Sequence, residues 1–143
     1  MSRYWVFVLK DFGKTSGLEI FDHRVKEKFW GLNANTHNAR RLRRGDYVVF
    51  YYGKQLLGTA TIASNTYELS VEDKQTYWRV KDFKHILGVK LDSIEAWEAP
   101  KRIEPLVDSL RFITRKRRWQ IHLQGGIREI SEDDYLTVTN ETI

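Results

Sequence analysis

One stretch of the chain limits its possible folds more than any other: residues 29–53, with the sequence FWGLNANTHNARRLRRGDYVVFYYG. It opens with an aromatic pair, Phe29 and Trp30, at the start of a loop rich in glycine and asparagine. A short segment with four arginines follows, and then the apolar run 47–52, which is typical of a buried strand. We therefore expect a loop, a cationic helix and a buried strand to lie side by side. Such an arrangement can hold a flat ring at one end and an anion at the other.

Positive charge is concentrated in two parts of the chain. The net charge is +5, and basic residues cluster in 40–44 and 111–118. Basic clusters interleaved with aromatic residues are the electrostatic footprint of a protein that binds a polyanion such as nucleic acid. This pattern favours a polyanion-binding protein over the alternative, in which both clusters are solvated faces of an ordinary basic protein.

The composition excludes several classes of protein. With 41% hydrophobic and 30% charged residues, the chain fits a globular protein better than a disordered one. Its length suits a single domain over residues 1–143. No apolar run approaches the roughly 18 residues that span a bilayer, and no signal-peptide cleavage site follows the N-terminal apolar stretch. We therefore expect a cytoplasmic protein without a membrane partner. The absence of cysteine excludes disulfides and thiolate metal ligands.

Catalytic motifs are also missing from the sequence. Neither G-x-S-x-G nor a P-loop is present, and the histidines lack the spacing of metal ligands. The only candidate acid or base is His122, which we expect to face outward opposite a core tryptophan, Trp119. The sequence therefore predicts a protein that is not an enzyme, with no catalytic residue, no metal site and no cofactor.

Hydrophobic periodicity predicts a mixed α/β chain of about five or six strands with short helices. We expect strands over residues 4–9, 47–52, 56–63, 86–97 and 119–123. The last of these is inferred from the alternation of Trp119, Ile121 and Leu123 with polar residues. Gly58 predicts a bulge or a close backbone approach within its strand. Ala99-Pro100 is expected to end the strand over 86–97.

The helices are expected at three places. Thr36 or Asn35 can cap a helix over 37–44, a second helix is expected over 103–110, and Ser131 is a good N-cap for the last one. Residues 18–28 fit a short helix only in part, so that segment stays open. Residues 29–35 and 64–75 are expected to be irregular, the second as a polar surface excursion.

Together, several of these segments resemble an EVE domain, a member of the PUA-like superfamily related to YTH domains. The matching segments are the opening strand YWVFVL, Trp30 with the loop and NARRLRRGDYVVFYYG, a returning strand with Gly58, and LRFITRKRRWQIHLQGGIREISEDDY. The last block is similar to that of small stand-alone EVE proteins of prokaryotes. The resemblance implies an α+β fold, namely a PUA-like mixed β-barrel of about five or six strands flanked by short helices, with a concave pocket on one side.

The resemblance also implies a binding site for a modified base. YTH domains hold N6-methyladenine of RNA in an aromatic cage, and some EVE domains are associated with modified cytosine in DNA. Trp30 matches the first cage tryptophan, Tyr77 or Trp78 is the nearest candidate for the second, and Asn33 or Asn35 is the candidate amide for the edge of the base. Aromatic walls contribute roughly 1–3 kcal/mol of stacking per base. The predicted base pocket comprises Trp30, Gly31, Asn33, Asn35, Asn38, Tyr77, Trp78 and Phe112.

The clustered arginines are expected to hold the phosphates that flank the base, which positions a strand without reading its sequence. The predicted phosphate-binding residues are Arg40, Arg41, Arg44, Arg115, Arg117 and Arg118. The predicted partner is therefore nucleic acid, RNA or DNA, that carries a modified base, with methylation as the expected modification. Three alternatives stay open: a module that binds a protein through its basic face, a nucleic-acid-processing enzyme, and a site for a free modified nucleoside. The sequence does not indicate the oligomeric state.

Overall fold

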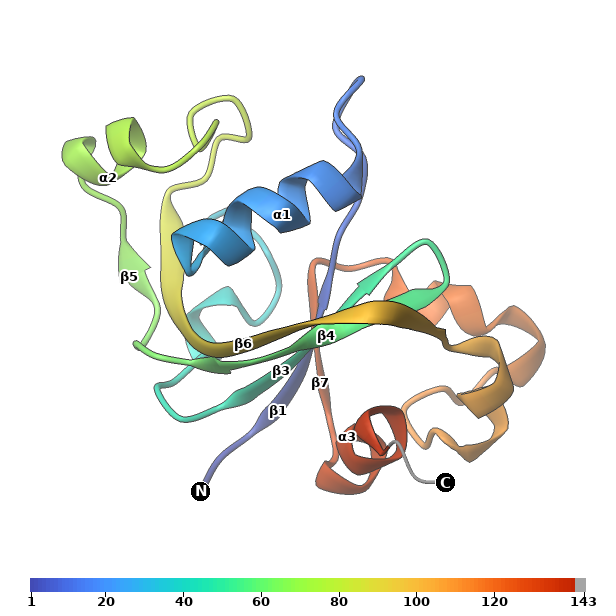
Figure 1. The fold of residues 1–143 in the computed structure, drawn as a ribbon. Coiled ribbons are helices and arrows are strands. Elements are labelled where there is room, and N and C mark those ends of the chain that lie inside the picture. Colours follow the sequence, from blue (N-terminus) through green and yellow to red (C-terminus); the bar gives the residue numbers. More distant parts are fainter. Residues whose placement is uncertain (141–143) are drawn as a thin grey trace.

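The computed structural model describes residues 1–140, which form one mixed sheet with short helices on both of its faces (Figure 1). The strands are β1 (Tyr4–Val8), β2 (Phe29–Leu32), β3 (Tyr47–Tyr52), β4 (Gln55–Ile62), β5 (Tyr67–Glu68), β6 (Leu87–Arg102) and β7 (Ile127–Ile130). The α-helices are α1 (Gly17–Glu27), α2 (Val71–Thr76) and α3 (Glu132–Thr139), and the 3₁₀-helices are η1 (Ala39–Arg41), η2 (Glu104–Ser109) and η3 (Lys116–Leu123).

The sheet has the strand order β2-β6-β4-β3-β1-β7, with β5 paired to β6. The pair β1–β3 is parallel, and the other pairs are antiparallel. The long strand β6 bends, because its first residues pair with β2 and the rest pair with β4. Figure 1 shows the first part of β6 rising beside β5 and the rest running along β4, so that the sheet curls into a half-barrel.

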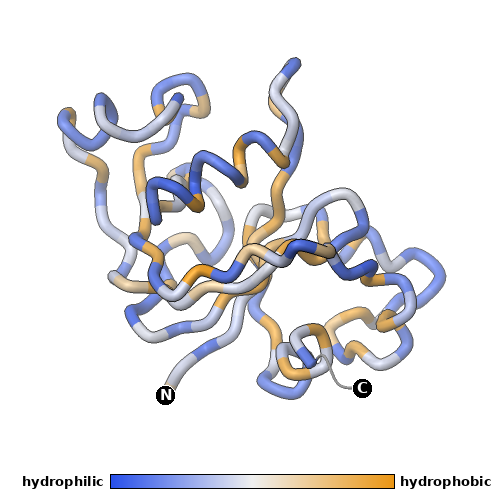
Figure 2. The backbone as a smooth tube through the Cα atoms, in the orientation of Figure 1, coloured by the Kyte–Doolittle hydropathy of each residue, from blue (hydrophilic) through white to orange (hydrophobic). Residues whose placement is uncertain are grey.

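Both faces of the central strands are buried, which explains their continuous apolar sequences. Alternate residues of β1 and β3 belong to two separate cores: Trp5, Phe7 and Phe50 lie in the core inside the curl, whereas Val6 and Val49 lie in the core on the outer face. We call these the inner core and the outer core. Helix α1 packs on the inner core, and η2, η3 and α3 pack on the outer one. Figure 2 shows the hydrophobic residues gathered where the strands cross and in the lobe that η2, η3 and α3 form.

The helix ends follow the expected capping chemistry. Ser16 caps α1 by accepting a hydrogen bond from the Glu19 amide (3.1 Å), which settles the segment that the sequence left open. Ser131 caps α3 in the same way, through the Asp134 amide (3.1 Å), as predicted. Within the described part of the chain, none of the helices combines the length and the apolar character that a membrane crossing needs.

Around the loop that opens the central stretch, two predictions are wrong. Residues 29–32 are strand β2, not irregular structure, because pairing with β6 overrides the weak local preference of this sequence for a strand. The predicted helix over 37–44 is only the single 3₁₀ turn η1. Its N-cap residue Asn38 has φ +67° and makes no side-chain capping bond, so no longer helix begins there.

Three further differences concern the rest of the chain. Residues 119–123 belong to η3, not to a strand: Trp119 and Leu123 are four residues apart and buried, whereas Ile121 is exposed. Strand β6 does not end at Ala99-Pro100 as predicted but continues through these residues. They lie where the register against β4 shifts, so the N–H that Pro100 lacks is not needed for strand pairing. The segment 64–75 contains β5 and the start of α2.

The prediction for Gly58 is confirmed. The register of β4 against both neighbouring strands shifts beside this residue. A Cβ atom at this position would lie 2.0 Å from the carbonyl oxygen of Glu95, so the backbones approach more closely than any larger residue allows.

Candidate functional site

A cavity of about 350 Å³ opens on the inner side of the half-barrel. Its walls come from the end of β1, the loop before α1, α1 itself, β2, and the segments around residues 33–36, 83–85 and 126. Several aromatic and charged side chains line it: Lys10, Asp11, Phe12, Arg24, Trp30, Asn33, Phe83 and His85. The cavity thus combines flat apolar surfaces with a few polar groups, as ligand-binding pockets commonly do.

Trp30 reaches the cavity from β2 and belongs mainly to the inner core. Its ring packs against Phe7 (5.2 Å between ring centroids) and Phe50 (5.1 Å), and only 7% of the residue is exposed. Its neighbour Phe29 points the other way, as alternation along a strand requires, and stacks on Tyr77. Trp30 is therefore a fixed wall of the cavity and not a mobile rim residue.

His85 lies directly over Gly31 on β2. A Cβ atom on residue 31 would lie 2.1 Å from the His85 Nδ1 atom, so only glycine leaves room for this ring. Burial, together with the nearby Arg24 charge, lowers the pKa of His85 to about 4. The ring is therefore neutral at pH 7. Its Nδ1 atom is buried and has no hydrogen-bond partner among the described residues.

Arg24 is a buried cation beside this histidine, with only 1% of the residue exposed. Its Nη1 atom donates to Glu27 (2.8 Å), and Glu27 in turn accepts a hydrogen bond from the Trp78 amide (2.7 Å). The guanidinium also lies over the rings of Phe29 and Phe83, at 5.5 and 5.6 Å. Burial lowers the pKa of Arg24, and the Glu27 charge partly opposes this effect. Its Nη2 atom has no partner in residues 1–140.

Two polar residues complete the cavity near its mouth. Asn33 donates to the backbone carbonyls of Lys84 (3.1 Å) and Phe83 (3.2 Å), in the amide orientation that matches donors with acceptors. One carboxylate oxygen of Asp11 accepts hydrogen bonds from the Tyr52 hydroxyl (2.5 Å) and the Gly17 amide (2.8 Å). The first of these bonds is the main reason that the pKa of Asp11 is lowered.

The structure brings only part of the predicted base pocket together. Trp30, Gly31 and Asn33 line the cavity, whereas the other five predicted residues do not. Asn35 is exposed on the loop, and Asn38 accepts a hydrogen bond from Arg41 (3.2 Å). The remaining three residues pack elsewhere: Tyr77 on Phe29 (3.8 Å), Trp78 on His23 (3.8 Å), and Phe112 in the outer core.

The predicted phosphate-binding arginines also divide into groups. The side chains of Arg40 and Arg44 make no hydrogen bond or ion pair with other residues of the described chain. Arg41 is paired with Glu129 (3.1 Å). Arg115, Arg117 and Arg118 are exposed at or within η3, whose Trp119 and Leu123 anchor it in the outer core.

The residues that give this cavity its chemistry were not predicted from the sequence. Arg24, His85, Phe12 and Phe83 come from three segments without a motif, and only the fold brings them together. One signal was present for Gly31, since glycine inside a strand often marks a close approach by another group. Residues 1–140 contain no cluster of three or more histidine, aspartate or glutamate side chains arranged to hold a metal ion.

The chain is similar to known proteins along nearly its whole length. Residues 3–141 match the EVE domain model. A UPF0310 protein of Pyrococcus abyssi is 30% identical over 124 residues, which cover 78% of this chain and 84% of that protein. A UPF0310 protein of Mycolicibacterium gilvum is 33% identical over 115 residues, which cover 77% and 79%.

Two solved structures share the fold. Human THYN1, in complex with DNA that contains 5-methylcytosine, has a TM-score of 0.64 at 12% identity, over 99% of each chain. The YTH domain of Zygosaccharomyces rouxii MRB1, in complex with N6-methyladenosine RNA, has a TM-score of 0.57 at 15% identity, over 96% of this chain and 84% of that one. The half-barrel is therefore the α+β, PUA-like fold that the sequence predicts.

Proposed function

Because the chain belongs to the EVE domain family, we propose that it binds nucleic acid and holds one modified base in the cavity beside Trp30. Two proteins that share this fold support the proposal: THYN1 was solved in complex with DNA that contains 5-methylcytosine, and the MRB1 YTH domain in complex with N6-methyladenosine RNA. A base reaches a pocket of this kind only when it is extruded from a duplex or presented on a single strand.

The observation that carries this proposal is the pair of unsatisfied polar atoms among the residues of the cavity wall. Buried polar groups in proteins nearly always have partners, and leaving one without a partner costs about 1–3 kcal/mol. Three such side-chain atoms occur in the described residues, and two of them, Arg24 Nη2 and His85 Nδ1, belong to residues that line this cavity. Rotation of either side chain toward a ligand in the cavity would give its unsatisfied atom a partner, and this supports a ligand site here.

The size and the lining of the cavity fit a single base. At about 350 Å³ it lies near the lower end of the range for small-molecule pockets, roughly 300–1,000 Å³. Phe83 and Trp30 offer apolar ring surfaces for stacking.

We propose further that the base carries an amino group, as 5-methylcytosine and N6-methyladenine both do. Such bases present an N–H donor beside a ring-nitrogen acceptor. The neutral ring of His85 offers one donor and one acceptor, and Asp11 has a carboxylate oxygen with no partner in the described chain. These groups complement an amino edge.

The experiment measures fluorescence anisotropy of labelled oligonucleotides in DNA and RNA. The panel carries 5-methylcytosine, 5-hydroxymethylcytosine, N6-methyladenine or no modification. We expect the wild type to bind one modified base at least tenfold more tightly than its unmodified counterpart. His85→Phe should remove this preference, whereas His122→Phe, a change to a histidine that does not line the cavity, should keep it. Equal, salt-sensitive binding across the whole panel would contradict the proposal.

We propose a binding role without catalysis. The candidate acid or base His122 is tied by a hydrogen bond from the Arg115 amide to its Nε2 atom (3.2 Å). Turnover of a modified oligonucleotide during the same measurements would argue for an enzyme instead. A cytoplasmic location and phosphate contacts by Arg115, Arg117 and Arg118 stay predictions.

A further inference from the structure

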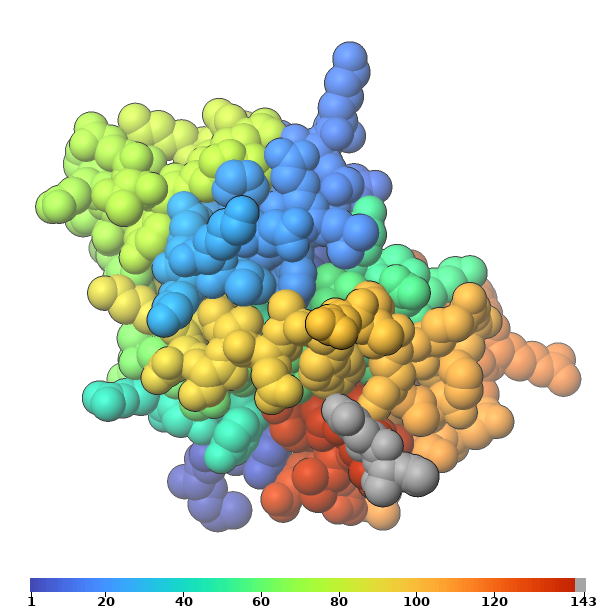
Figure 3. Space-filling view, in the orientation of Figure 1, coloured from blue at the N-terminus to red at the C-terminus, as the bar shows by residue number. Residues whose placement is uncertain are grey.

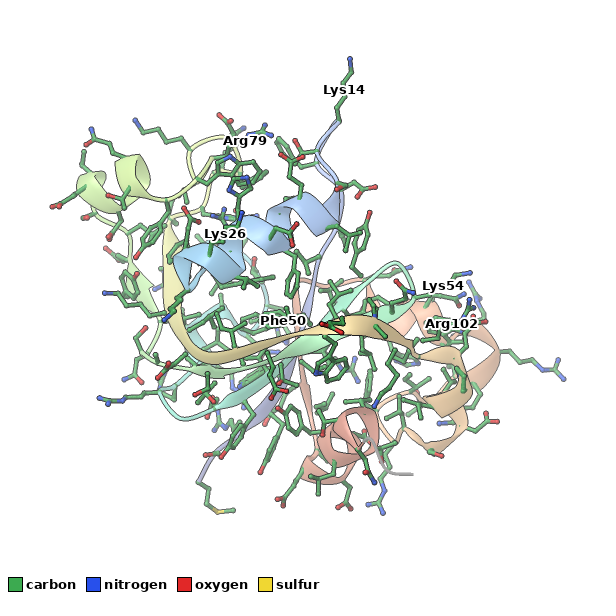
Figure 4. The ribbon with its side chains drawn as sticks, in the orientation of Figure 1. Lys14, Lys26, Phe50, Lys54, Arg79 and Arg102 are labelled. Carbon is green, nitrogen blue, oxygen red and sulfur yellow. The ribbon has the colours of Figure 1, made fainter. Side chains whose placement is uncertain are left out.

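The loop before α1 forms a small finger at the mouth of the cavity. We use this name for residues 11–15. Two backbone hydrogen bonds close it, from the Phe12 amide to the Thr15 carbonyl (2.8 Å) and from the Thr15 amide to the Phe12 carbonyl (2.9 Å). Gly13 and Lys14 form the turn between them. The finger projects from the body of the molecule, with Lys14 at its tip (Figures 3 and 4).

The finger is held in place from two sides. At its base, Asp11 is fixed by the Tyr52 hydroxyl and the Gly17 amide. On its flank, the Arg79 guanidinium donates to the Thr15 hydroxyl (2.5 Å) and lies 5.6 Å from the centre of the Phe12 ring. These contacts make the finger a preorganised element, because little conformational freedom is left to lose on binding.

Phe12 occupies an unusual position on this finger. Its ring contacts Phe83 edge to face, with 4.8 Å between the centroids, and both residues line the cavity. The residue is nevertheless 44% exposed, so part of it faces solvent at the mouth. Single exposed apolar side chains are common on protein surfaces. Here, however, the ring stands beside a candidate ligand site, with exposed lysines before and after it, Lys10 and Lys14.

We propose that Phe12 stacks on the nucleotide next to the bound base and that Lys14 contacts a phosphate of the same strand. The inference rests on the proposed function of the cavity. An aromatic ring with a lysine beside it is the combination that binds single-stranded nucleic acid without regard to sequence. The cavity would thus select the base, and the finger would hold the adjoining strand.

The test is a thermodynamic cycle on the neighbouring nucleotide. Two probes are used in single-stranded form: DNA with a central 5-methylcytosine, and RNA with a central N6-methyladenosine. Each probe is made with a normal nucleotide or an abasic residue on either side of the modified base. Removing the stacked neighbour should weaken binding to the wild type roughly tenfold on one side. The Phe12→Ala protein should bind the normal and the abasic probes equally.

Three variants complete the experiment. Phe12→Trp should restore the sensitivity to the abasic neighbour. Leu18→Ala, which removes another exposed apolar side chain outside the cavity lining, should leave it as in the wild type. Lys14→Gln should lower the slope of log affinity against log salt by about 0.7.

The outcomes separate the two proposals. If the Phe12→Ala protein stays as sensitive to the abasic neighbour as the wild type, or if the wild type is insensitive on both sides, the finger does not contact the neighbouring nucleotide. In either case selective binding of the modified base would still support the function of the cavity. If the wild type prefers no modified base in the full panel of DNA and RNA oligonucleotides described above, the proposed function and this inference both fail.

Discussion

The two sides of the sheet differ in how completely they are packed and hydrogen-bonded. On the outer side, the polar groups are paired: both carboxylate oxygens of the buried Asp134 accept backbone amides, and the amine of the exposed residue Lys116 donates to the carbonyls of Val107 (2.9 Å) and Leu110 (2.7 Å). On the inner side, the chain leaves a cavity with unsatisfied atoms of Arg24 and His85 among its lining residues.

This difference suits a fold that is stabilised mainly on its outer side and that, under the proposed function, binds its ligand on the inner side. Hydrogen bonds that are all made stabilise a structure, whereas unsatisfied buried groups lower its stability and persist where a function needs them. The outer side also holds η3, which begins within the basic segment 111–118. If the cavity is the binding site, clustered positive charge indicates its place in this chain less well than unsatisfied polar atoms do.

The largest effect should come from Asp134 on the outer side. Its carboxylate accepts hydrogen bonds from the amides of Arg111 and Phe112, both at 2.9 Å. Asp134→Ala leaves both donors without a partner and should lower the free energy of unfolding by about 2–4 kcal/mol. Urea denaturation measures this loss, and oligonucleotide affinity should stay unchanged where the protein is folded. Asp133→Ala is the control, because that exposed carboxylate makes only a 3.6 Å ion pair with Arg111 and should change stability by less than about 1 kcal/mol. If the two substitutions lowered the free energy of unfolding equally, the hydrogen bonds of Asp134 would not stabilise the outer side in the way described here.

The next effect concerns pH and the inner side. The unfolded chain takes up a proton on His85 near pH 6.5, but the folded protein does so only near pH 4. Between these values the unfolded state binds more protons, so stability falls as the pH falls, by at most about 3 kcal/mol from this residue. Denaturation at several pH values should show a shallower decline for His85→Gln than for the wild type. His122→Gln should change the curve less, since His122 is nearer the surface. Parallel curves for wild type and His85→Gln would mean that His85 is not held neutral by its surroundings.

The smallest effect should come from the free arginines around η1. Each phosphate contact contributes about 0.7–0.9 to the slope of log affinity against log salt. Replacing Arg40 and Arg44 with glutamine should lower this slope by about 1.4–1.8, with similar losses for every sequence. Arg41→Gln is the matched control, because Glu129 already neutralises that guanidinium. An unchanged slope in the double variant would mean that Arg40 and Arg44 contact no phosphate and are ordinary solvated surface residues.

Much of the fold could be predicted because its signals are local. The apolar runs of β1 and β3, the glycine of β4 and the Ser131 cap of α3 all depend on neighbouring residues. Strand β2 could not be predicted, since its strand form comes from pairing with β6, more than fifty residues away in sequence. Segment η3 was misread because Trp119 and Leu123 fit a period of two as well as a spacing of four.

The candidate site was harder to predict than the fold. Trp30, Gly31 and Asn33 lie in the expected cavity because they share one short segment with the family's motif. Tyr77 and Trp78 are the nearest candidates for the family's second cage position, and Phe112 precedes the second basic segment, but the fold uses these three rings for packing elsewhere. Arg24 and His85 carry no sequence signal, because a lone arginine on a helix and a lone histidine in a loop are common. They become unusual only in the folded protein, where each is buried with one polar atom unsatisfied.

The most direct test of the account is to replace Arg24 with methionine and its ion-pair partner Glu27 with glutamine, and to measure stability and binding on the same samples. Both charges of the buried pair are then removed together, a change that is often neutral or stabilising, whereas removing one partner alone is destabilising. The glutamine oxygen can still accept the Trp78 amide, and Glu27 does not line the cavity. The account predicts unchanged or increased stability in urea, together with at least a tenfold loss of affinity for the preferred modified oligonucleotide. A large loss of stability, with the affinity of the folded protein unchanged, would contradict it and make Arg24 a structural residue of the inner core.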